Sequence, residues 1–383
     1  MSDAAATEPD RDGPSRLFLG PNWFAAVMGT GIVANAGVSL PYHVPGLIGF
    51  AHGVWLVASA LLVVLVAVTA SHWLRDRDLA RSHGRDVQMS HFYGAPPMAF
   101  MTVGAGALLA GQWLLGHSLA VGVDWVLWSA GTLGGLVTAV VMPFRLFTQI
   151  EVRPDAAFGG WLMPVVPPMV SASTGALLIP SLAASWRPTL FYACFALFGM
   201  SLFAALIIIT LIWSRLAHFG SSHSARVPTL WIVLGPLGQS ITAAGLLGAQ
   251  AHLATSADIT RGMEVFSVLY GVPVWGFAML WAMLALALTL HTWRRRLPFA
   301  LTWWSFTFPV GVTVTGTIRL AAETGLGAFR VASAVGYLAL LSAWTLVFTR
   351  TALGARRGQL LRVPAPASTT PPAFKTPLEA RVP

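Results

Sequence analysis

The residues of this sequence that could do chemistry are polar side chains set within long apolar segments, often beside glycine or proline. Hydroxyl and amide groups can donate hydrogen bonds to an anion that has lost its water. Glycine and proline interrupt a helix, which frees backbone groups and lets the backbone approach a ligand closely. A path for small anions is therefore predicted, lined by Thr30, Gly31, Ser171, Ser173, Thr174, Gly235, Gln239 and Thr313. Further polar residues of the same segments are Asn22, Asn35, Gln112, Thr242, Thr315 and Thr317.

A proline interrupts one of these segments next to two phenylalanines. Pro309 has no N–H, so the carbonyl of Ser305 loses its helical partner and the ring forces a hinge. A bulky ring at such a bend can plug a narrow path, and an apolar constriction can also close it by dewetting. Residue types alone leave open whether Phe306 or Phe308 closes a path or packs against its neighbours.

Acidic residues do not fall in the middle of the apolar segments. Asp124 and Glu264 fall near segment starts, and Glu323 falls just beyond a segment end. Proton relays and cation-selective rings use carboxylates within the membrane, so both are disfavoured here. Arg319, near a segment end, can attract an anion, extend to the interface, or pair with Glu323 one turn later, and these roles stay open.

Catalytic motifs do not accompany these groups. The sequence contains no G-x-S-x-G, no H-E-x-x-H and no P-loop, and its one cysteine is Cys194. No metal and no cofactor are expected. The alternative function is a membrane-embedded enzyme acting on a lipid-soluble substrate, and its candidate site is the loop at 72–91 with Asp76, Asp78 and His83.

The elements that must position these groups are helices that cross a membrane. Of the 383 residues, 56% are hydrophobic and only 10% are charged, and the mean hydropathy is +0.69. Soluble domains carry about 25% charged residues, so a soluble enzyme and a disordered chain are both excluded. Apolar blocks of about 20 residues predict transmembrane helices, because barrel strands would alternate over about ten. Ten spans are predicted, near 22–38, 45–71, 96–115, 121–147, 161–182, 187–214, 228–250, 264–291, 298–320 and 327–350.

Basic residues predict how these spans are oriented. Of the 23 Lys and Arg residues, 19 fall in the terminal segments or in loops after even-numbered spans. Cytoplasmic loops carry an excess of Lys and Arg, so both termini are predicted to be cytoplasmic at the plasma (inner) membrane. The net charge of +9 is thus explained by basic residues that orient the spans in the membrane, and no nucleic-acid partner is expected. The predicted domains are a cytoplasmic segment at 1–20, a ten-helix domain at 21–350 and a disordered Pro-rich tail at 351–383.

Odd-numbered and even-numbered spans differ in composition. The odd spans are shorter, richer in Gly and Pro, and hold much of the polarity, whereas several even spans are uninterrupted apolar runs. Interrupted backbone is tolerated at membrane depth only inside protein or against a water-filled cavity. An all-α fold is therefore predicted, with five helical hairpins around a central pore and the even helices facing lipid. The alternative is that small residues merely allow close helix packing.

Four motifs on odd spans resemble the tellurite-resistance/dicarboxylate transporter family. They are GPNWFAAVMGTGI (20–32), WLMPVVPPMVSASTG (161–175), PTLWIVLGPLGQ (228–239) and LTWWSFTFPVG (301–311). This family includes fungal malate permeases, sulfite efflux pumps, bacterial tellurite-resistance proteins and plant slow anion channels. The resemblance covers about 21–350 and implies five hairpins with odd helices lining the pore, and commonly a trimer. It also implies a pore-occluding phenylalanine on the ninth helix, which matches Phe308.

Residues and resemblance together predict an anion transporter with a channel-like pore. Its expected cargo is a C4-dicarboxylate such as malate, or sulfite or another inorganic anion. An arginine-rich cytoplasmic mouth would concentrate the anion, and donors of the odd helices would replace its water. Phe308 would restrict passage.

Overall fold

All regular secondary structure in the computed structural model is helical, over the residues it describes: 19–85, 87–149, 152–220, 224–294 and 297–361. The predicted all-α class is confirmed for these residues. The α-helices are α1 (Phe24–Ser39), α2 (Leu47–Arg75), α3 (Arg77–Arg85), α4 (Val87–His91), α5 (Ala95–Leu109), α6 (Gln112–Thr148), α7 (Pro167–Leu178), α8 (Arg187–Phe219), α9 (Leu234–Gln250), α10 (Ala257–Trp293), α11 (Phe308–Thr324) and α12 (Gly327–Arg356).

Seven helical stretches of the described chain are long and apolar enough to cross a membrane. The chain is thus a multi-pass helical membrane protein. These stretches are Leu47–Arg75, Met89–Leu109, Gln112–Thr148, Arg187–Phe219, Arg226–Leu253, Ala257–Trp293 and Gly327–Arg356. The helices α1, α7 and α11, which fall on three further predicted spans, are 16, 12 and 17 residues long.

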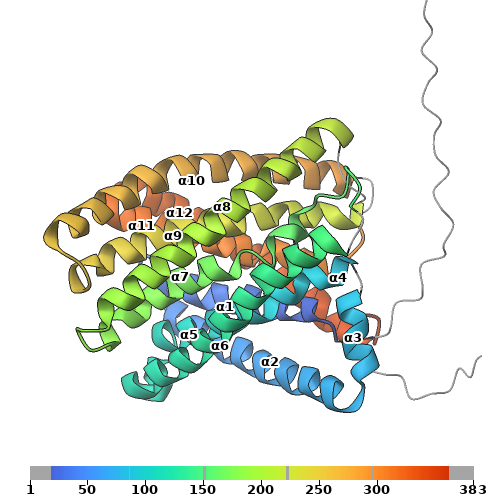
Figure 1. Ribbon diagram of the computed structural model, residues 1–383, viewed down its shortest axis with the longest axis horizontal. Helices are drawn as coiled ribbons and strands as arrows, with labels where there is room; N and C mark the ends of the chain where they lie inside the picture. Colours follow the sequence, from blue (N-terminus) through green and yellow to red (C-terminus); the bar gives the residue numbers. More distant parts are fainter. Residues whose placement is uncertain (1–18, 86, 150–151, 221–223, 295–296, 362–383) are drawn as a thin grey trace, which may run out of the picture.

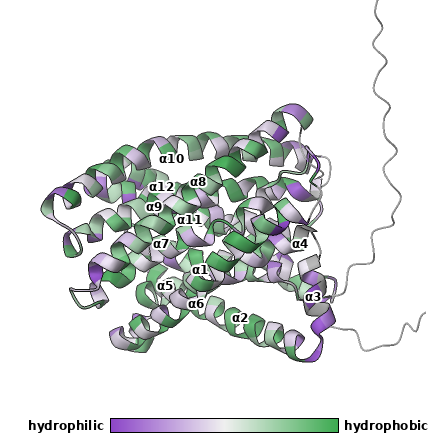
Figure 2. Ribbon diagram, viewed as in Figure 1, coloured by the Kyte–Doolittle hydropathy of each residue, from purple (hydrophilic) through white to green (hydrophobic). Residues whose placement is uncertain are grey.

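Two kinds of helix make up the molecule. The inner helices α1, α5, α7, α9 and α11 are short and mostly buried; in α1, for example, 14 of 16 residues are buried. The outer helices α2, α6, α8, α10 and α12 are longer and mostly exposed, and α6 buries only 4 of its 37 residues. Their exposed surface carries large apolar side chains such as Val63, Phe203 and Leu269, as lipid contact requires. In Figure 2, hydrophobic residues follow one another along the ribbons of α2 and α8, and hydrophilic residues concentrate toward the helix ends and around α3.

The inner helices form a closed ring. Each one packs against two inner neighbours, in the order α1, α5, α7, α9, α11 and back to α1. Each one also packs against the outer helix that follows it in the chain, so the outer helices surround the ring. In Figure 1, α1, α7 and α9 lie between α10 at one edge of the molecule and α2 at the other.

A short 3-10 helix precedes every inner helix. These segments are Pro21–Trp23, Phe92–Gly94, Gly159–Leu162, Ser224–Val233 and Leu301–Phe306. Proline in the first turn of α5, α7 and α11 favours this change of helix type, since a first-turn proline sacrifices no intrahelical hydrogen bond. The predicted interruption of the odd spans is therefore a junction between two helices near the start of each span.

Several segment ends differ from the sequence prediction. The break after α5 comes at Gly111, so α6 begins at Gln112, nine residues before the predicted 121. A second interruption follows at Gly116, whose φ of 71° suits glycine. The outer helix α12 continues to Arg356, past the predicted end at 350. An apolar window misses the end of α12, because that helix extends into polar sequence. It also places the boundary between α5 and α6 too late, because Trp113, Leu114 and Leu115 continue the apolar run beyond the break.

Two acidic residues also lie elsewhere than predicted. Asp124 lies well inside α6 with none of its surface exposed, so its predicted place near a span start was wrong. Glu323 lies in the last turn of α11 rather than beyond that span. The terminal predictions at 1–18 and 362–383 fall outside the described residues.

Candidate functional site

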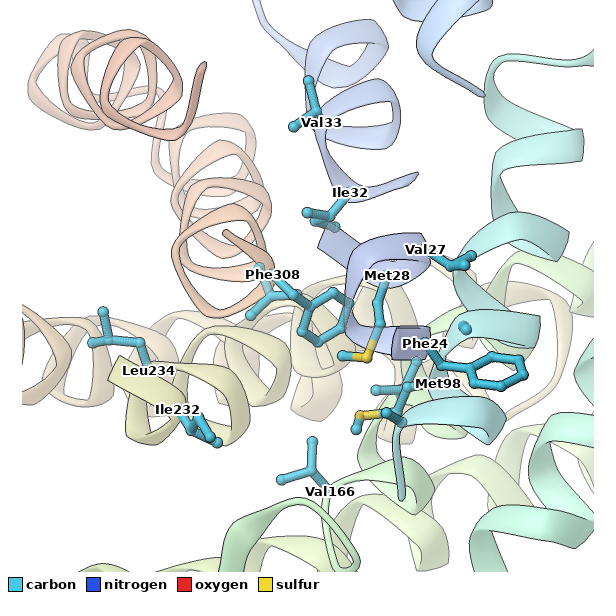
Figure 3. Packing of buried hydrophobic residues seen from close by; sticks show 14 of the residues in the cluster. Phe24, Val27, Met28, Ile32, Val33, Met98, Val166, Ile232, Leu234 and Phe308 are labelled. Carbon is cyan, nitrogen blue, oxygen red and sulfur yellow. The ribbon is translucent and has the colours of Figure 1, made fainter. Parts of the chain in front are cut away.

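A narrow apolar cavity lies inside the ring at the beginnings of the inner helices. It has a volume of about 30 Å³, and all five inner segments contribute to its lining. Its wall includes Met28 of α1, Met98 of α5, Val166 before α7, Ile232 before α9 and Phe308 of α11. Figure 3 shows the ring of Phe308 directed toward Met28, with Met98 and Val166 beyond them. We call this space the narrow cavity.

Local structure fixes the position of Phe308. The 3-10 helix ends at Phe306, Thr307 adopts φ −107° and ψ −75°, and α11 begins at Phe308. Gly29 of α1 leaves room for this junction, because a Cβ there would collide with Trp304 and with the hydroxyl of Thr307. Phe308 is therefore held against α1, and only 4% of its surface is exposed.

A larger polar cavity lies further along the same five helices. Its volume is about 290 Å³, and it is lined by residues such as Asn35 of α1, Ala105 of α5, Thr174 of α7, Gln239 of α9 and Arg319 of α11. On every inner helix, these residues lie closer to the C-terminal end than those of the narrow cavity. The five inner helices therefore run in parallel. We call this larger space the polar vestibule.

Hydrogen bonds between side chains join three walls of the polar vestibule. The amide Nε2 of Gln239 donates to Oγ of Ser173, which links α9 to α7. The hydroxyls of Thr242 and Thr315 lie 2.8 Å apart and link α9 to α11. This side of the vestibule is therefore held by polar contacts as well as by packing.

Four of the eight predicted path residues, together with the predicted gate Phe308 and the predicted hinge Pro309, line one of the two cavities. Phe308, Pro309 and Gly235 line the narrow cavity. A Cβ added at Gly235 would meet no atom within 4 Å, so this glycine leaves the cavity open on the α9 side. The polar vestibule is lined by Ser173, Thr174 and Gln239.

Four predicted path residues instead face neighbouring helices. Thr30 accepts a hydrogen bond from Trp344 Nε1 of α12 at 3.2 Å. Gly31 packs against Thr102 of α5. The remaining two, Ser171 and Thr313, donate to carbonyls of their own helices, and Ser171 also contacts Thr132 of α6 while Thr313 contacts Leu234 of α9.

The vestibule also contains polar residues that the predicted path omitted. These are Asn35, Ser39, Thr242, Thr315 and Arg319. Their spacing carries a signal: Asn35 and Ser39, like Thr315 and Arg319, are four residues apart and so share one helix face. The predicted path omits them because it rests on residue type and segment and does not use the shared helix face.

Asp124 and the ionisable residues of the segment at 72–91 lie away from these two cavities. Asp124 faces Gly104 between α5 and α6, and neither of its carboxyl oxygens has a hydrogen-bond partner. The segment at 72–91, predicted as a loop, is largely helical, because it holds the end of α2 together with α3 and α4. In it, His72 and His83 line a separate cavity of about 290 Å³, whereas Asp76 and Asp78 do not. No group of three or more His, Cys, Asp or Glu residues suited to a metal ion occurs within the described part of the chain.

Comparisons with known proteins agree in the kind of protein they indicate. A family model, SLAC1, described as a voltage-dependent anion channel, matches residues 19–352. An uncharacterized transporter of Methanocaldococcus jannaschii is 28% identical over 298 residues, which cover 78% of this chain and 82% of the relative. A sulfite efflux pump of Trichophyton rubrum is 27% identical over 354 residues, which cover 89% of this chain and 92% of the pump. A malic acid transport protein of Schizosaccharomyces pombe is 22% identical over 237 residues, which cover 58% of this chain and 54% of that protein.

Proposed function

Because the chain belongs to the SLAC1 family of voltage-dependent anion channels, we propose that it carries small anions across the plasma membrane along the axis of its inner ring. Candidate cargoes are sulfite and C4-dicarboxylates such as malate, the classes for which two of its relatives are named. The observation that carries the proposal is that both cavities are enclosed by the same five helices. A path along the ring axis joins them in sequence.

Ten membrane crossings, arranged as five hairpins in one domain over 21–350, make up this pore. The closed ring of inner helices and the outer helix packed against each one support this arrangement. The narrow cavity then faces the cytoplasm, together with the arginine-rich loops that concentrate the anion. Both chain ends are cytoplasmic, and the protein assembles as a trimer, as the family resemblance implies.

Phe308 acts as the gate of this pore. A cavity of about 30 Å³ admits only a few water molecules, so an anion passes only when the ring moves aside. The surrounding side chains of Met28, Met98 and Val166 offer no hydrogen bonds to replace lost hydration. An apolar constriction of this kind excludes water and ions together.

An enzyme working through the loop at 72–91 has less support. The relatives named for an activity are transport proteins, and the aspartates of this loop do not line the cavity beside it. Replacing Asp76, Asp78 and His83 together is expected to leave anion flux largely intact.

The test compares two phenylalanines of the same segment. Phe308→Ala is expected to raise potential-driven flux of chloride, nitrate, sulfite or malate in proteoliposomes at least severalfold, because it widens the narrow cavity. Phe306→Ala is the matched control, since Phe306 packs against Trp231 and Trp303 and does not line the cavity. Its flux is expected to stay near that of the unmodified protein.

The possible results test the Phe308 gate and the transport function separately. Equal flux for Phe308→Ala and the unmodified protein, with both active, contradicts the gate. No flux of any anion through a folded protein contradicts transport itself. Flux of malate or sulfite only, and only with a pH gradient, identifies a proton-linked carrier rather than a channel.

A further inference from the structure

The hydroxyl groups of the polar vestibule are already engaged as donors. A serine or threonine hydroxyl has one hydrogen to donate, and in this cavity each hydroxyl lies within hydrogen-bond distance of a carbonyl in its own helix. The polar vestibule therefore shows an anion mainly hydroxyl lone pairs, which do not bind it. Ser39 donates to Asn35 O at 2.8 Å, Ser173 to Val170 O at 3.0 Å and Thr174 to Val170 O at 2.8 Å. One of Thr242 and Thr315 donates to the other at 2.8 Å, and the remaining one donates to its own helix, at Gly238 O or Val312 O.

Two side chains of the polar vestibule keep spare N–H groups. Gln239 uses one amide hydrogen on Ser173 and has a second. Arg319 has five N–H donors, and no hydrogen bond or ion pair joins its side chain to another residue of the described chain. Its Nε is buried and has no acceptor, an arrangement that costs free energy unless a ligand or water supplies one.

The neighbouring carboxylate of Glu323 does not occupy the N–H groups of Arg319. Glu323 lies one turn further along α11, and its Oε2 accepts a hydrogen bond from Ser267 of α10 at 2.9 Å. The carboxylate is thus turned toward α10, although it still acts on Arg319 electrostatically. Gly245 of α9 makes room for both side chains, because a Cβ there would lie 2.5 Å from Oε1 of Glu323 and 3.0 Å from Cβ of Arg319.

We infer that Arg319 and Gln239 form an oxyanion-binding site in the polar vestibule, and that Arg319 selects anions with two oxygens on one atom. A planar guanidinium donates two parallel hydrogen bonds to such a pair of oxygens, as in sulfite or a carboxylate. Chloride is a single centre, so two parallel N–H groups cannot both point straight at it, and it gains less from the guanidinium than a pair of oxygens does. This inference rests on the proposed transport function, because it assigns selectivity to one end of the same path.

Anion binding to purified full-length protein in detergent tests the site without transport. Titration calorimetry with sodium sulfite, malate and chloride is run on the unmodified protein, Arg319→Gln and Arg319→Lys. Arg319→Gln is expected to weaken sulfite and malate binding by about tenfold or more, since charge-assisted hydrogen bonds are lost. Arg319→Lys keeps the charge but not the fork, so it is expected to bind the three anions with similar affinities. The control is Arg330→Gln, an equal charge change at an exposed position of α12 on the same predicted side of the membrane.

The same variants in proteoliposomes connect the site to selectivity. The ratio of sulfite flux to chloride flux is expected to fall in Arg319→Gln and to stay unchanged in Arg330→Gln. Unaltered sulfite and malate affinity in folded Arg319→Gln overturns the inference, as does a protein that binds neither anion. If Arg319→Gln does not fold, undiminished oxyanion preference in Arg319→Lys overturns it instead. Anion binding that depends on Arg319 in a protein without flux supports the site while rejecting the transport proposal.

Discussion

The direction of a side chain decides its role in this protein more than its chemical type does. Ser171 and Ser173 are two residues apart on α7, yet Ser171 faces Thr132 of an outer helix and Ser173 faces Gln239 in the polar vestibule. Phe306 and Phe308 differ in the same way: one packs among tryptophans and the other lines the narrow cavity. Neighbouring residues of one type therefore make matched pairs for experiments.

The two serines give a prediction at this scale. Ser173→Ala removes the acceptor that holds the Gln239 amide, so sulfite affinity is expected to fall by about threefold, as for one neutral hydrogen bond. Ser171→Ala is expected to leave the affinity unchanged and to lower the melting temperature slightly, because Thr132 loses a buried partner. Calorimetric titration and thermal melting in detergent measure both effects. A larger affinity loss for Ser171→Ala than for Ser173→Ala would show that the structural assignment of the two faces is wrong.

At the scale of helices, close approach of the inner helices depends on residues without side chains. A Cβ at Gly238 of α9 would lie 2.5 Å from the backbone nitrogen of Thr313 in α11. A Cβ at Gly316 would lie 2.9 Å from the carbonyl oxygen of Gly238. Small residues let membrane helices pack backbone to backbone, where dispersion replaces the hydrophobic effect as the source of stability. The abundant glycine of the odd spans thus serves packing at Gly238 and openness of the narrow cavity at Gly235.

Alanine substitution at these two glycines separates the two uses. Gly238→Ala is expected to destabilise the protein by about 1–3 kcal/mol, because its methyl group collides with the α11 backbone. Gly235→Ala is expected to fold normally, since its methyl group meets open space in the narrow cavity. Melting temperatures in detergent compare the two, and a large loss at Gly235 with none at Gly238 would contradict the observed packing of α9.

At the scale of the whole molecule, the closed ring explains why the outer helices can be so exposed. The ring satisfies the interrupted backbone of its own members, and the outer helices present uninterrupted hydrogen-bonded backbone and apolar side chains to lipid. This arrangement gives every inner helix the same orientation. The positive ends of five helix dipoles then point toward the narrow cavity, which supports the proposed passage of an anion there.

The orientation of the molecule in the membrane is a further prediction. The only cysteine, Cys194, is fully buried, so introduced cysteines can be labelled over a low background. A membrane-impermeant maleimide added to intact cells is expected to label Ser256→Cys, in the loop between α9 and α10. It is expected to label Arg153→Cys, in the loop after α6, only after the membrane is opened. The reverse pattern would place both chain ends outside the cytoplasm.

The fold class and the division between inner and outer segments can be predicted from the amino-acid sequence. These follow from local composition, because lipid admits only helices with satisfied backbone and interrupted helices must lie inside protein. The four motifs also identified the family, which the match over 19–352 confirms. Helix ends were less accurate, since α12 extends into polar sequence and the apolar run across Gly111 hides the boundary between α5 and α6.

Which side of each inner helix faces the cavities depends on packing between helices. The helices α1 and α7 consist of small or apolar residues on all sides, so their sequences do not show which way Thr30, Ser171 or Ser173 points. Neighbouring helices make that choice through contacts between residues far apart in the chain, such as Trp344 with Thr30. The same contacts bury Asp124 and leave Arg319 without a partner in the polar vestibule. Packing across the ring thus decides which polar groups form hydrogen bonds between helices and which remain available to a ligand.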